Sequence, residues 1–503
     1  MAVGGRRRTC GVVRSAAVAL PALLAVQILA PAGRSASLPW ARSTNLNPVQ
    51  MENRLPGTKS WRLKVLSYQG EIQGYASSPS VSPNGTISVS VSTTGKTFVA
   101  NVYRMGWYGG KGARLVLSLS PMLGHRRPMP KPNPRTGLII CHWPVSFTIH
   151  VGASWLSGIY MVKLTASNTH QAYVPFTVTS PASDARFIFI HGVFTDEAYN
   201  DWGGKSLYVG LGYPPSQQYN HRAVKVAFHR PFVQNMGAGW FFSWEYHMVR
   251  WLERRGYDVT YATDLDVDLH PALLLRHRAI LITGHDEYWS RSIRSGMYEA
   301  VGRGVSLANF AANTGYWQVR IEPYHHQRDE LVVCYKTSPD PLRFRKPWLT
   351  TTMWRNPPLN EPESELTGAM YGSYEGSHGP FNWTVTSPRN WIFRGTGLRT
   401  GSQIEGIVGH EIDTVVPGYP HPRLHVIAAS RIIDSDDHVQ TAKSTIYRNA
   451  HGATIFDAGT IDWSWGLDDV RQNFWLYPPI PRRPDVAAQV ITANILKRMG
   501  HLP

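Results

Sequence analysis

The sequence predicts a multidomain protein in which an all-β sandwich precedes an α/β domain built on a doubly wound parallel sheet. Short segments of alternating apolar and polar residues fill positions 60–180, and after position 186 apolar strands alternate with amphipathic helices. A small polar linker at 179–183 separates the two patterns. The chain has 503 residues, of which 43% are hydrophobic and 17% charged, so it has ample material for packed cores.

The N-terminal segment has the order of a signal peptide. Three arginines at 6–8 precede a mostly apolar run at 15–30, and small residues follow up to Ser37. The run is short for a membrane span, so we expect export of the chain by the Sec or the Tat route. A membrane anchor is the alternative. The net charge is +17, but no nucleic-acid-binding motif accompanies it, so we expect no nucleic acid partner.

The predicted sandwich follows a polar arm at 38–59. Ile87, Val89 and Val91 alternate with serines, which is the period of a half-buried strand. A proline-rich segment at 124–135 predicts a loop. We expect further strands at 97–105, 114–119, 147–151, 158–164 and 174–178.

The predicted α/β domain occupies residues 181–503. One helix is expected after Ser243 and ends at Gly256, a second ends at Gly304, and a last one runs from about 485 to 499. Strands are expected at 186–190, 258–262, 279–283, 305–310, 404–412, 425–430, 444–447 and 453–458.

Polar and aromatic residues follow the predicted strands of this domain. Ligands bind beyond the carboxyl ends of the strands in open α/β sheets, so a site is expected there. The residues at this edge are His191, Thr263, Asp264, His285, Asp286, Glu287, Tyr288 and Asn313, with Glu245 and Tyr246 from a following helix. Tyrosine and carboxylate oxygens together suit a hard trivalent cation such as Fe(III). The alternative is that these tyrosines are packed core residues, each donating one hydrogen bond.

Other catalytic patterns are weaker. The chain has no Gly-x-Ser-x-Gly elbow and no His-Glu-x-x-His zinc motif. Beyond the signal segment its cysteines are Cys141 and Cys334, which form neither a disulfide framework nor a zinc signature. A cysteine hydrolase that uses one of them is a further alternative.

Nine segments carry a family resemblance. They are NPVQMENRLPGTKSW (47–61), YRMGWYGG (103–110), YNDWGGKSLY (199–208), WEYHMVRWLE (244–253), GYDVT (256–260), GHDEYWS (284–290), NTGYWQVR (313–320), GHEID (409–413) and GTIDWSWGL (459–467). In these segments the sequence resembles the large (beta) subunit family of N,N-dimethylformamidase. The resemblance implies an immunoglobulin-like sandwich, a domain related to class I glutamine amidotransferases, and a mononuclear iron held by two tyrosines and one glutamate.

Carried over residue by residue, the resemblance implies Tyr246, Tyr288 and Glu411 as the iron ligands, with Tyr199 or Tyr208 as alternatives to Tyr246. His285, Asp286 and His410 are the expected proton-transfer groups.

The leading expectation is therefore an exported iron-dependent hydrolase of a small non-peptide amide, in which a metal-activated water attacks the carbonyl. A separate small subunit or a homo-oligomer is the expected assembly. A non-catalytic secreted protein that binds a glycan or a cell-wall component on the same scaffold is the alternative. The sequence leaves the identity of the amide open.

Overall fold

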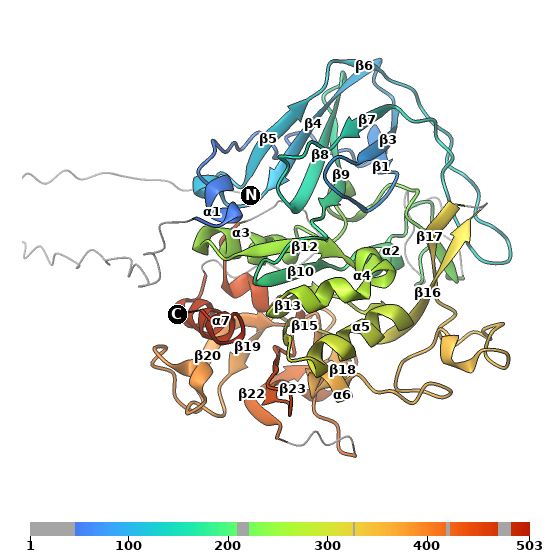
Figure 1. Cartoon of the computed structure of the whole chain (residues 1–503). Coiled ribbons are helices and arrows are strands. Elements are labelled where there is room, and N and C mark those ends of the chain that lie inside the picture. The colour runs from blue at the N-terminus through green and yellow to red at the C-terminus, as the bar shows by residue number, and fades with distance from the viewer. Residues whose placement is uncertain (1–45, 209–220, 325–326, 419–422, 471–483, 503) are drawn as a thin grey trace, which may run out of the picture. The chain divides into compact units, whose positions relative to one another are not determined.

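The structure is a computed structural model (Figure 1), and its described part comprises residues 46–208, 221–324, 327–418, 423–470 and 484–502. The predicted signal segment at 1–37 lies outside these residues, and export remains a prediction. Within the described part, every helix is too short or too polar to cross a bilayer.

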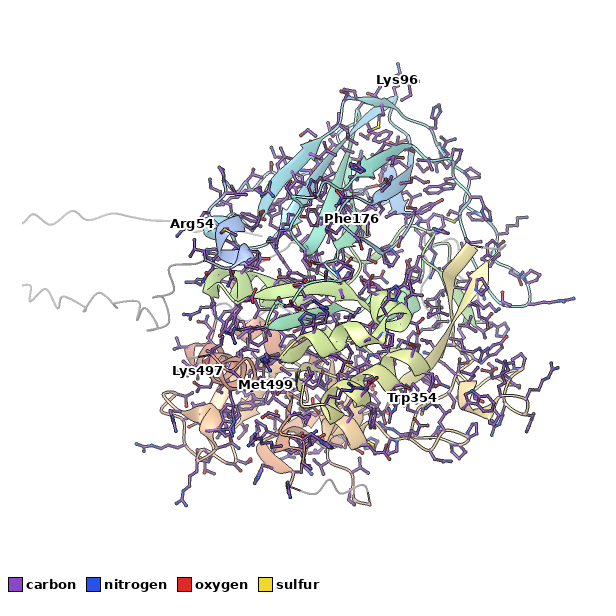
Figure 2. All side chains as sticks on the ribbon, viewed as in Figure 1. Arg54, Lys96, Phe176, Trp354, Lys497 and Met499 are labelled. Carbon is purple, nitrogen blue, oxygen red and sulfur yellow. The ribbon has the colours of Figure 1, made fainter. Side chains whose placement is uncertain are left out.

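Two sheets form the N-terminal part, and their strand pairs are antiparallel except for the parallel pair of β2 and β9. A three-stranded sheet has the order β1-β3-β7, and a second sheet has the order β2-β9-β8-β4-β5 with β6 paired to β4. Apolar side chains from both sheets fill the space between them, for example Phe176, labelled in Figure 2. The strands are β1 (Ile72–Ala76), β2 (Ser80–Val81), β3 (Thr86–Thr93), β4 (Thr97–Met105), β5 (Ala113–Ser118), β6 (Met122–Leu123), β7 (Phe147–His150), β8 (Gly158–Ala166) and β9 (Gln171–Val178).

Strand β3 departs in part from the predicted alternation. Ile87, Val89 and Val91 point into the core as expected, but Ser90 and Ser92 are buried as well. The segment that follows β6 covers them, and the Ser90 hydroxyl donates to the carbonyl of Trp143. The buried Ser90 hydroxyl on the polar face of β3 is therefore hydrogen-bonded to a protein group rather than to water.

A seven-stranded sheet forms the centre of the second half, in the order β12-β10-β13-β15-β24-β23-β22. Strands β12, β10, β13, β15 and β24 are parallel, whereas β23 and β22 continue the sheet in antiparallel pairs. The bounds are β10 (Phe187–His191), β12 (Val259–Thr263), β13 (Ala279–His285), β15 (Ser306–Ala312), β22 (His425–Ile433), β23 (Val439–Arg448) and β24 (Thr454–Asp457).

Helices cover both faces of this sheet. On β10, Phe187 and Phe189 pack on the side of α3 (Glu245–Arg255) and α7 (Val486–Met499). The intervening Ile188 and Ile190 pack on the side of α2, α4 and α5. These three helices are α2 (Val193–Tyr199), α4 (Asp264–Leu269) and α5 (Arg291–Gly302). The strand residues are apolar on both faces because both are covered.

The three helices predicted from the sequence are confirmed, and their ends follow local chemistry. Helix α3 ends at Gly256, whose φ of 71° is left-handed. The side chains of Ser290 and Asp485 accept hydrogen bonds from the first turns of α5 and α7. The immunoglobulin-like and amidotransferase-like assignments, and the boundary near residue 180, remain predictions.

One predicted strand is wrong in a way that matters for the site. Residues 404–412 form two strands, β20 (Gln403–Val408) and β21 (Glu411–Thr414), not one. Gly409 and His410 separate them. His410 has a φ of 57°, in the left-handed region that is uncommon for residues other than glycine. The break turns His410 and Glu411 toward the edge of the central sheet.

Smaller elements surround this framework. Strands β11 (Lys225–Ala227), β17 (Gln327–Val333), β16 (Trp317–Tyr324) and β14 (Tyr288–Ser290) form one sheet. Strand β18 (Met370–Tyr374) pairs with β21, and β19 (Phe381–Thr384) pairs with β20. The remaining helical segments are α1 (Pro48–Glu52), α6 (Ser364–Thr367), η1 (Tyr108–Gly110), η3 (Gln234–Gly237), η4 (Pro271–Arg276), η5 (Pro347–Leu349), η6 (Trp391–Phe393) and η7 (Ile461–Gly466).

Helix α3 lies between the sandwich and the central sheet (Figure 1). Its outward side chains share one apolar cluster with Trp61, Met105 and Met161, so a single core continues from the sandwich into the α/β region. This packing fixes the directions of the buried side chains of α3, those of residues 245–253.

Candidate active site at the carboxyl edge of the central sheet

A cavity of about 420 Å³ lies at the carboxyl edge of the central sheet. His285 ends β13 and Asn313 follows β15, so two neighbouring parallel strands supply its floor. The turn between β20 and β21 supplies another wall. The lining residues are Tyr199, Tyr208, Trp240, Trp244, His285, Glu287, Asn313, Tyr316, Trp317, Tyr371, Tyr374, His410, Glu411 and Ile461.

Two tyrosines converge on the carboxylate of Glu287. The Tyr208 hydroxyl lies 2.7 and 3.0 Å from the two carboxylate oxygens, and the Tyr199 hydroxyl donates to Oε2 at 2.8 Å. The Tyr288 hydroxyl in turn donates to that of Tyr208 at 2.7 Å. Burial and the charge of Glu287 raise the pKa of all three phenols well above its ordinary value. They are protonated unless a cation takes the place of the proton.

A second carboxylate, that of Glu411, lies beside the first. The side-chain amide of Asn313 donates to its Oε2 at 2.5 Å. The Nε2 atom of His285 lies 3.2 Å from this oxygen and 3.4 Å from Oε2 of Glu287, so the imidazole bridges the two acids. Burial opposes the charge on His285, but Glu411 raises the pKa of the imidazole. Burial and Glu411 also raise the pKa of Glu287.

Lys336 is a functional candidate that sequence reasoning missed. Its Nζ lies 3.1 Å from the centre of the Tyr208 ring and 4.9 Å from that of Trp317, and only 8% of the residue is exposed. Burial lowers the pKa of this amine to about 8. Lys336 follows the β16–β17 hairpin, which is not part of the parallel sheet, so the strand-end rule gives no signal for it.

The structure brings together most of the predicted site residues. His285, His410 and Glu411 line the cavity, and Tyr288 reaches it through Tyr208. Tyr199 and Tyr208, the alternatives to Tyr246, also line it. Glu287 belongs to the predicted edge, but only the geometry shows that it is the acid on which the tyrosines converge.

Tyr246 does not belong to this cluster, which corrects the predicted ligand set. Its hydroxyl donates to the carbonyl of Gly112 at 2.6 Å, and its ring packs edge-to-face on Trp61. The preceding residue, Glu245, points toward the central sheet, where its Oε2 lies 2.5 Å from Nδ1 of His191. Successive helical residues point about 100° apart, so Tyr246 points toward the sandwich instead.

Asp286, predicted as a proton-transfer group, does not line the cavity either. It is 1% exposed, and its charged neighbours are Asp264, Glu245, His191 and His285. Burial raises the pKa of Asp286 to about 7. The side chain is not among those that line the cavity, so it is not placed to exchange a proton with a ligand there.

The cysteine alternative loses support from the structure. Cys141 is 3% exposed and Cys334 is fully buried. Burial raises the pKa of both thiols, that of Cys334 to about 11. A reactive cysteine needs the opposite environment, with access to solvent and a lowered pKa.

The donor set suits a hard cation. The hydroxyl oxygens of Tyr199 and Tyr208 lie within 3.0 Å of carboxylate oxygens of Glu287. The Tyr199 hydroxyl also lies 3.5 Å from Oε1 of Glu411. Glu287 and Glu411 are 2% and 14% exposed at their side chains, so little water reaches them. Buried acids in such proximity need compensating positive charge, and oxygen donors of this kind are those a trivalent iron prefers.

The fold and the cavity define the class of protein. It is an α/β protein with an oxygen-rich ligand cavity beyond the carboxyl ends of parallel strands. The chain belongs to the N,N-dimethylformamidase beta subunit-like family, whose C-terminal region matches residues 99–474. This confirms the resemblance seen in the sequence.

Two curated relatives are distant in sequence. The chain is 26% identical over 275 residues to the N,N-dimethylformamidase beta subunit of Paracoccus aminophilus, and the match covers 47% of this chain but only 34% of the relative. The same values describe the N,N-dimethylformamidase beta subunit of an Alcaligenes species. A crystal structure of an uncharacterized Bacillus anthracis protein is similar over 24% of this chain and 86% of its own, at 10% identity, but its TM-score of 0.15 supports no argument.

Proposed function

We propose that the chain is an iron-dependent hydrolase of a small non-peptide amide, with Tyr199, Tyr208 and Glu287 holding the metal. The observation that supports this most is the convergence of the two phenol oxygens on one buried carboxylate. Membership of the N,N-dimethylformamidase beta subunit-like family supports the hydrolase class. This set contains none of Tyr246, Tyr288 and Glu411, the ligands expected first from the sequence, although Tyr199 and Tyr208 are the alternatives expected for Tyr246.

The residues of the cavity have distinct roles in this proposal. Iron bound there would polarise the amide carbonyl and lower the pKa of a bound water. His285, between Glu287 and Glu411, can hold a proton within the site, and Asn313 fixes the orientation of Glu411. Aromatic rings such as those of Trp240 and Trp244, which contact each other, line the cavity. A cavity of this size suits a small substrate.

The assembly and the export of the chain are further parts of the proposal. Both curated relatives are named as beta subunits, so we expect either a separate small subunit or a homo-oligomer. Light scattering on the purified chain, alone and with candidate partner subunits, measures this directly. The signal-like pattern of residues 1–37 supports export, and N-terminal sequencing of secreted material tests it.

The experiment for the metal compares matched tyrosine variants. We expect the purified chain to contain close to one iron and to be coloured by a phenolate-to-iron charge-transfer band. Tyr208→Phe and Glu287→Gln should each remove most of the iron and the colour. Tyr246→Phe is the matched control, because it also deletes one buried phenol but should leave both unchanged.

Amine release from small formamides and acetamides tests the reaction. Iron that is lost equally in Tyr246→Phe and Tyr208→Phe would contradict the ligand set. If the chain contains iron but hydrolyses none of these amides, the proposed metal site stands and the proposed substrate class is wrong. A wild-type chain that stays free of iron after expression with ample metal would favour the non-catalytic binding protein instead.

A further inference from the structure

A second cavity lies at the amino edge of the central sheet. Its volume is about 610 Å³, against about 420 Å³ for the cavity of the candidate active site, and the two share no lining residue. Strand β24 runs parallel to β15, and its first residue, Thr454, lines this second cavity. The active-site cavity lies at the opposite, carboxyl edge of the same strands. A ligand of the second cavity is therefore separate from the substrate of the proposed hydrolysis.

The charged side chains that line the second cavity are all basic. Arg423, Arg448 and Arg498 line it together with His425, and no aspartate or glutamate is among its described lining residues. Within the part of the chain that the structure describes, none of the three guanidinium groups forms an ion pair. We call this site the basic cavity.

The fold brings two of the arginines to the same end of one hairpin. Strands β22 and β23 are antiparallel and pair His425 with Ile446. Arg423 lies two residues before His425, and Arg448 lies two residues after Ile446. Both side chains therefore come from the open end of the hairpin, where like charges at facing positions repel each other. An anion bound between them would offset this repulsion.

Two of the guanidinium groups are held in place by uncharged neighbours. The Nε atom of Arg448 donates to the carbonyl of Gly452 at 3.0 Å. The guanidinium of Arg498, at the end of α7, lies 4.8 Å from the centre of the Trp391 ring in η6. The side-chain amide of Asn494 ties α7 to η6 through two backbone carbonyls, each at 2.8 Å. These contacts orient the arginines but leave their charge uncompensated.

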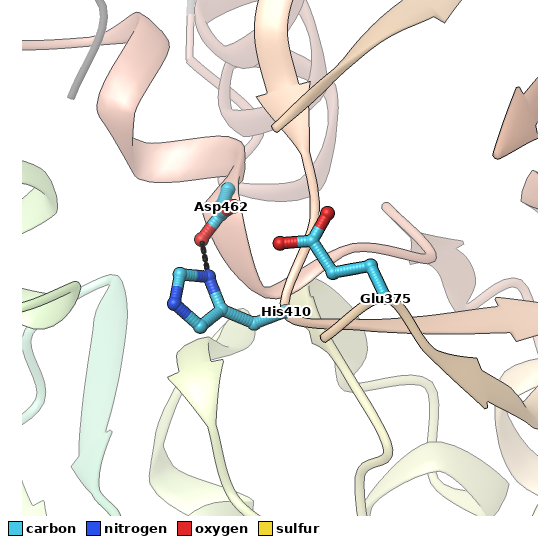
Figure 3. Close-up of side chains that lie close together, drawn as sticks. All are labelled: Glu375, His410 and Asp462. Carbon is cyan, nitrogen blue, oxygen red and sulfur yellow. Dashed lines mark hydrogen bonds and ion pairs between the residues drawn. The ribbon is translucent and has the colours of Figure 1, made fainter. Parts of the chain in front are cut away.

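The active-site cavity is different, because its basic groups have acidic partners. His285 lies beside two glutamates, as described above. The Nδ1 atom of His410 lies 2.8 Å from Oδ1 of the buried Asp462, as Figure 3 shows. The same Oδ1 accepts a hydrogen bond from the indole of Trp244 at 3.0 Å. The basic cavity thus has the charge of an anion site, and the active-site cavity does not.

Phosphate is the anionic group that suits the basic cavity best. A guanidinium presents paired N–H donors that match two oxygens of a phosphate or a carboxylate. A phosphate monoester carries about two negative charges at neutral pH and three terminal oxygens. These oxygens point in different directions, so arginines from separate segments can bind the same group, whereas a carboxylate offers only two oxygens in one plane. The volume is that of a small-molecule site, which leaves room for the organic part of the ester.

We propose that the basic cavity binds a small phosphate monoester, with the guanidinium groups of Arg423, Arg448 and Arg498 on the phosphate oxygens. This binding is separate from the proposed hydrolysis and requires neither iron nor an amide. The ester is either a soluble molecule or the headgroup of a lipid, since both present the same group.

Calorimetric titration of the full chain with glycerol 3-phosphate, and with inorganic phosphate, tests the proposal. We expect saturable binding of one molecule per chain. Arg423→Gln and Arg448→Gln should each weaken it by about 10–100-fold, because each removes charge-assisted hydrogen bonds. Arg431→Gln is the matched control, since this arginine is also exposed and lies on β22 but outside the cavity. Its affinity should equal that of the wild type.

Two outcomes of this titration would overturn the proposal. Weakening in Arg431→Gln equal to that in Arg448→Gln would show general attraction to a basic surface. Phosphate also binds Fe(III), so the titration is repeated on Glu287→Gln. Loss of binding in this variant would place the anion at the iron instead. Unchanged binding supports the basic cavity whether or not the chain proves to hold iron or to hydrolyse an amide.

Two further probes identify the class of ligand and its source. Malonate bound as tightly as glycerol 3-phosphate, and lost in the same variants, would contradict the phosphate class. Sedimentation with phosphatidic acid vesicles but not with phosphatidylcholine vesicles, abolished in Arg448→Gln and without binding of the soluble ester, would identify a lipid headgroup as the ligand. Binding of neither phosphate, ester nor phosphatidic acid would overturn the proposal.

Discussion

The guanidinium of Arg104 on β4 and the carboxylate of Glu253 on α3 form a two-bond ion pair, with distances of 2.7 and 3.0 Å and no exposed side-chain surface on either partner. Glu253 also accepts from the Tyr261 hydroxyl at 3.1 Å. The pair joins the sandwich to the helix that covers the central sheet. It therefore contributes to the rigid placement of the α/β edge.

Arg104→Met should lower the free energy of unfolding by about 3–5 kcal/mol, because it leaves the Glu253 carboxylate buried without its partner. Urea denaturation measures this. The double variant Arg104→Met/Glu253→Leu should recover part of the loss, since it removes the orphaned charge as well. Arg303→Ala breaks an exposed pair with Glu299 and should cost under about 1 kcal/mol. A loss of unfolding free energy in Arg104→Met as small as that in Arg303→Ala would contradict the prediction.

His247 should make the chain sensitive to acid. It is fully buried on α3, and burial lowers its pKa to about 4, although its Nε2 bonds the carbonyl of Val470. As pH falls from about 6.5 to about 4, the unfolded chain takes up a proton that the folded chain refuses, which costs on the order of 3 kcal/mol of stability. His247→Gln removes this titration. The difference between the two proteins in unfolding free energy should shift by that amount between neutral pH and about pH 4, and a constant difference would count against it.

Gly409→Ala should disturb the turn that carries His410. A Cβ at this position would lie 2.5 Å from Oδ2 of Asp462 and 2.9 Å from Oε1 of Glu375. Because Asp462 is fixed by two hydrogen bonds, the clash should cost about 1–3 kcal/mol. Gly302→Ala is the control, because a Cβ there meets no atom within 4 Å and a helix gains about 0.5–1 kcal/mol from alanine. Thermal unfolding of both variants in parallel tests the contrast.

Tyr288→Phe distinguishes the ligand set proposed from the structure from the one expected from the sequence. The Tyr288 hydroxyl contacts Tyr208 rather than a carboxylate. We expect this variant to keep most of its iron, with a shifted charge-transfer band because Tyr208 loses a hydrogen bond. Loss of iron equal to that in Tyr208→Phe would restore Tyr288 as a ligand. Metal analysis and the visible spectrum decide between the two.

Local sequence patterns are enough to predict most of the helices and strands and the edge of the sheet where the cavity lies. Helices α3 and α5 follow from apolar residues repeating at helical spacing and from glycine near their ends, because those signals act within a few residues. The ends of the predicted strands, such as His285, likewise predict where the cavity lies, because the strand signals are also local. The family resemblance added Glu411 and His410, which do line it.

Which side chains meet depends on packing between segments that are far apart in the chain. Tyr199 and Tyr208 reach Glu287 across 88 and 79 residues of chain, and no local pattern records such a contact. Tyr246 sits in a well-matched segment, yet one helical step turns it toward the sandwich. Likewise, the pairing of His410 with Asp462 depends on a left-handed break between β20 and β21. Periodicity fixes which residues are buried, but the direction of a buried side chain depends on what the rest of the chain packs against it.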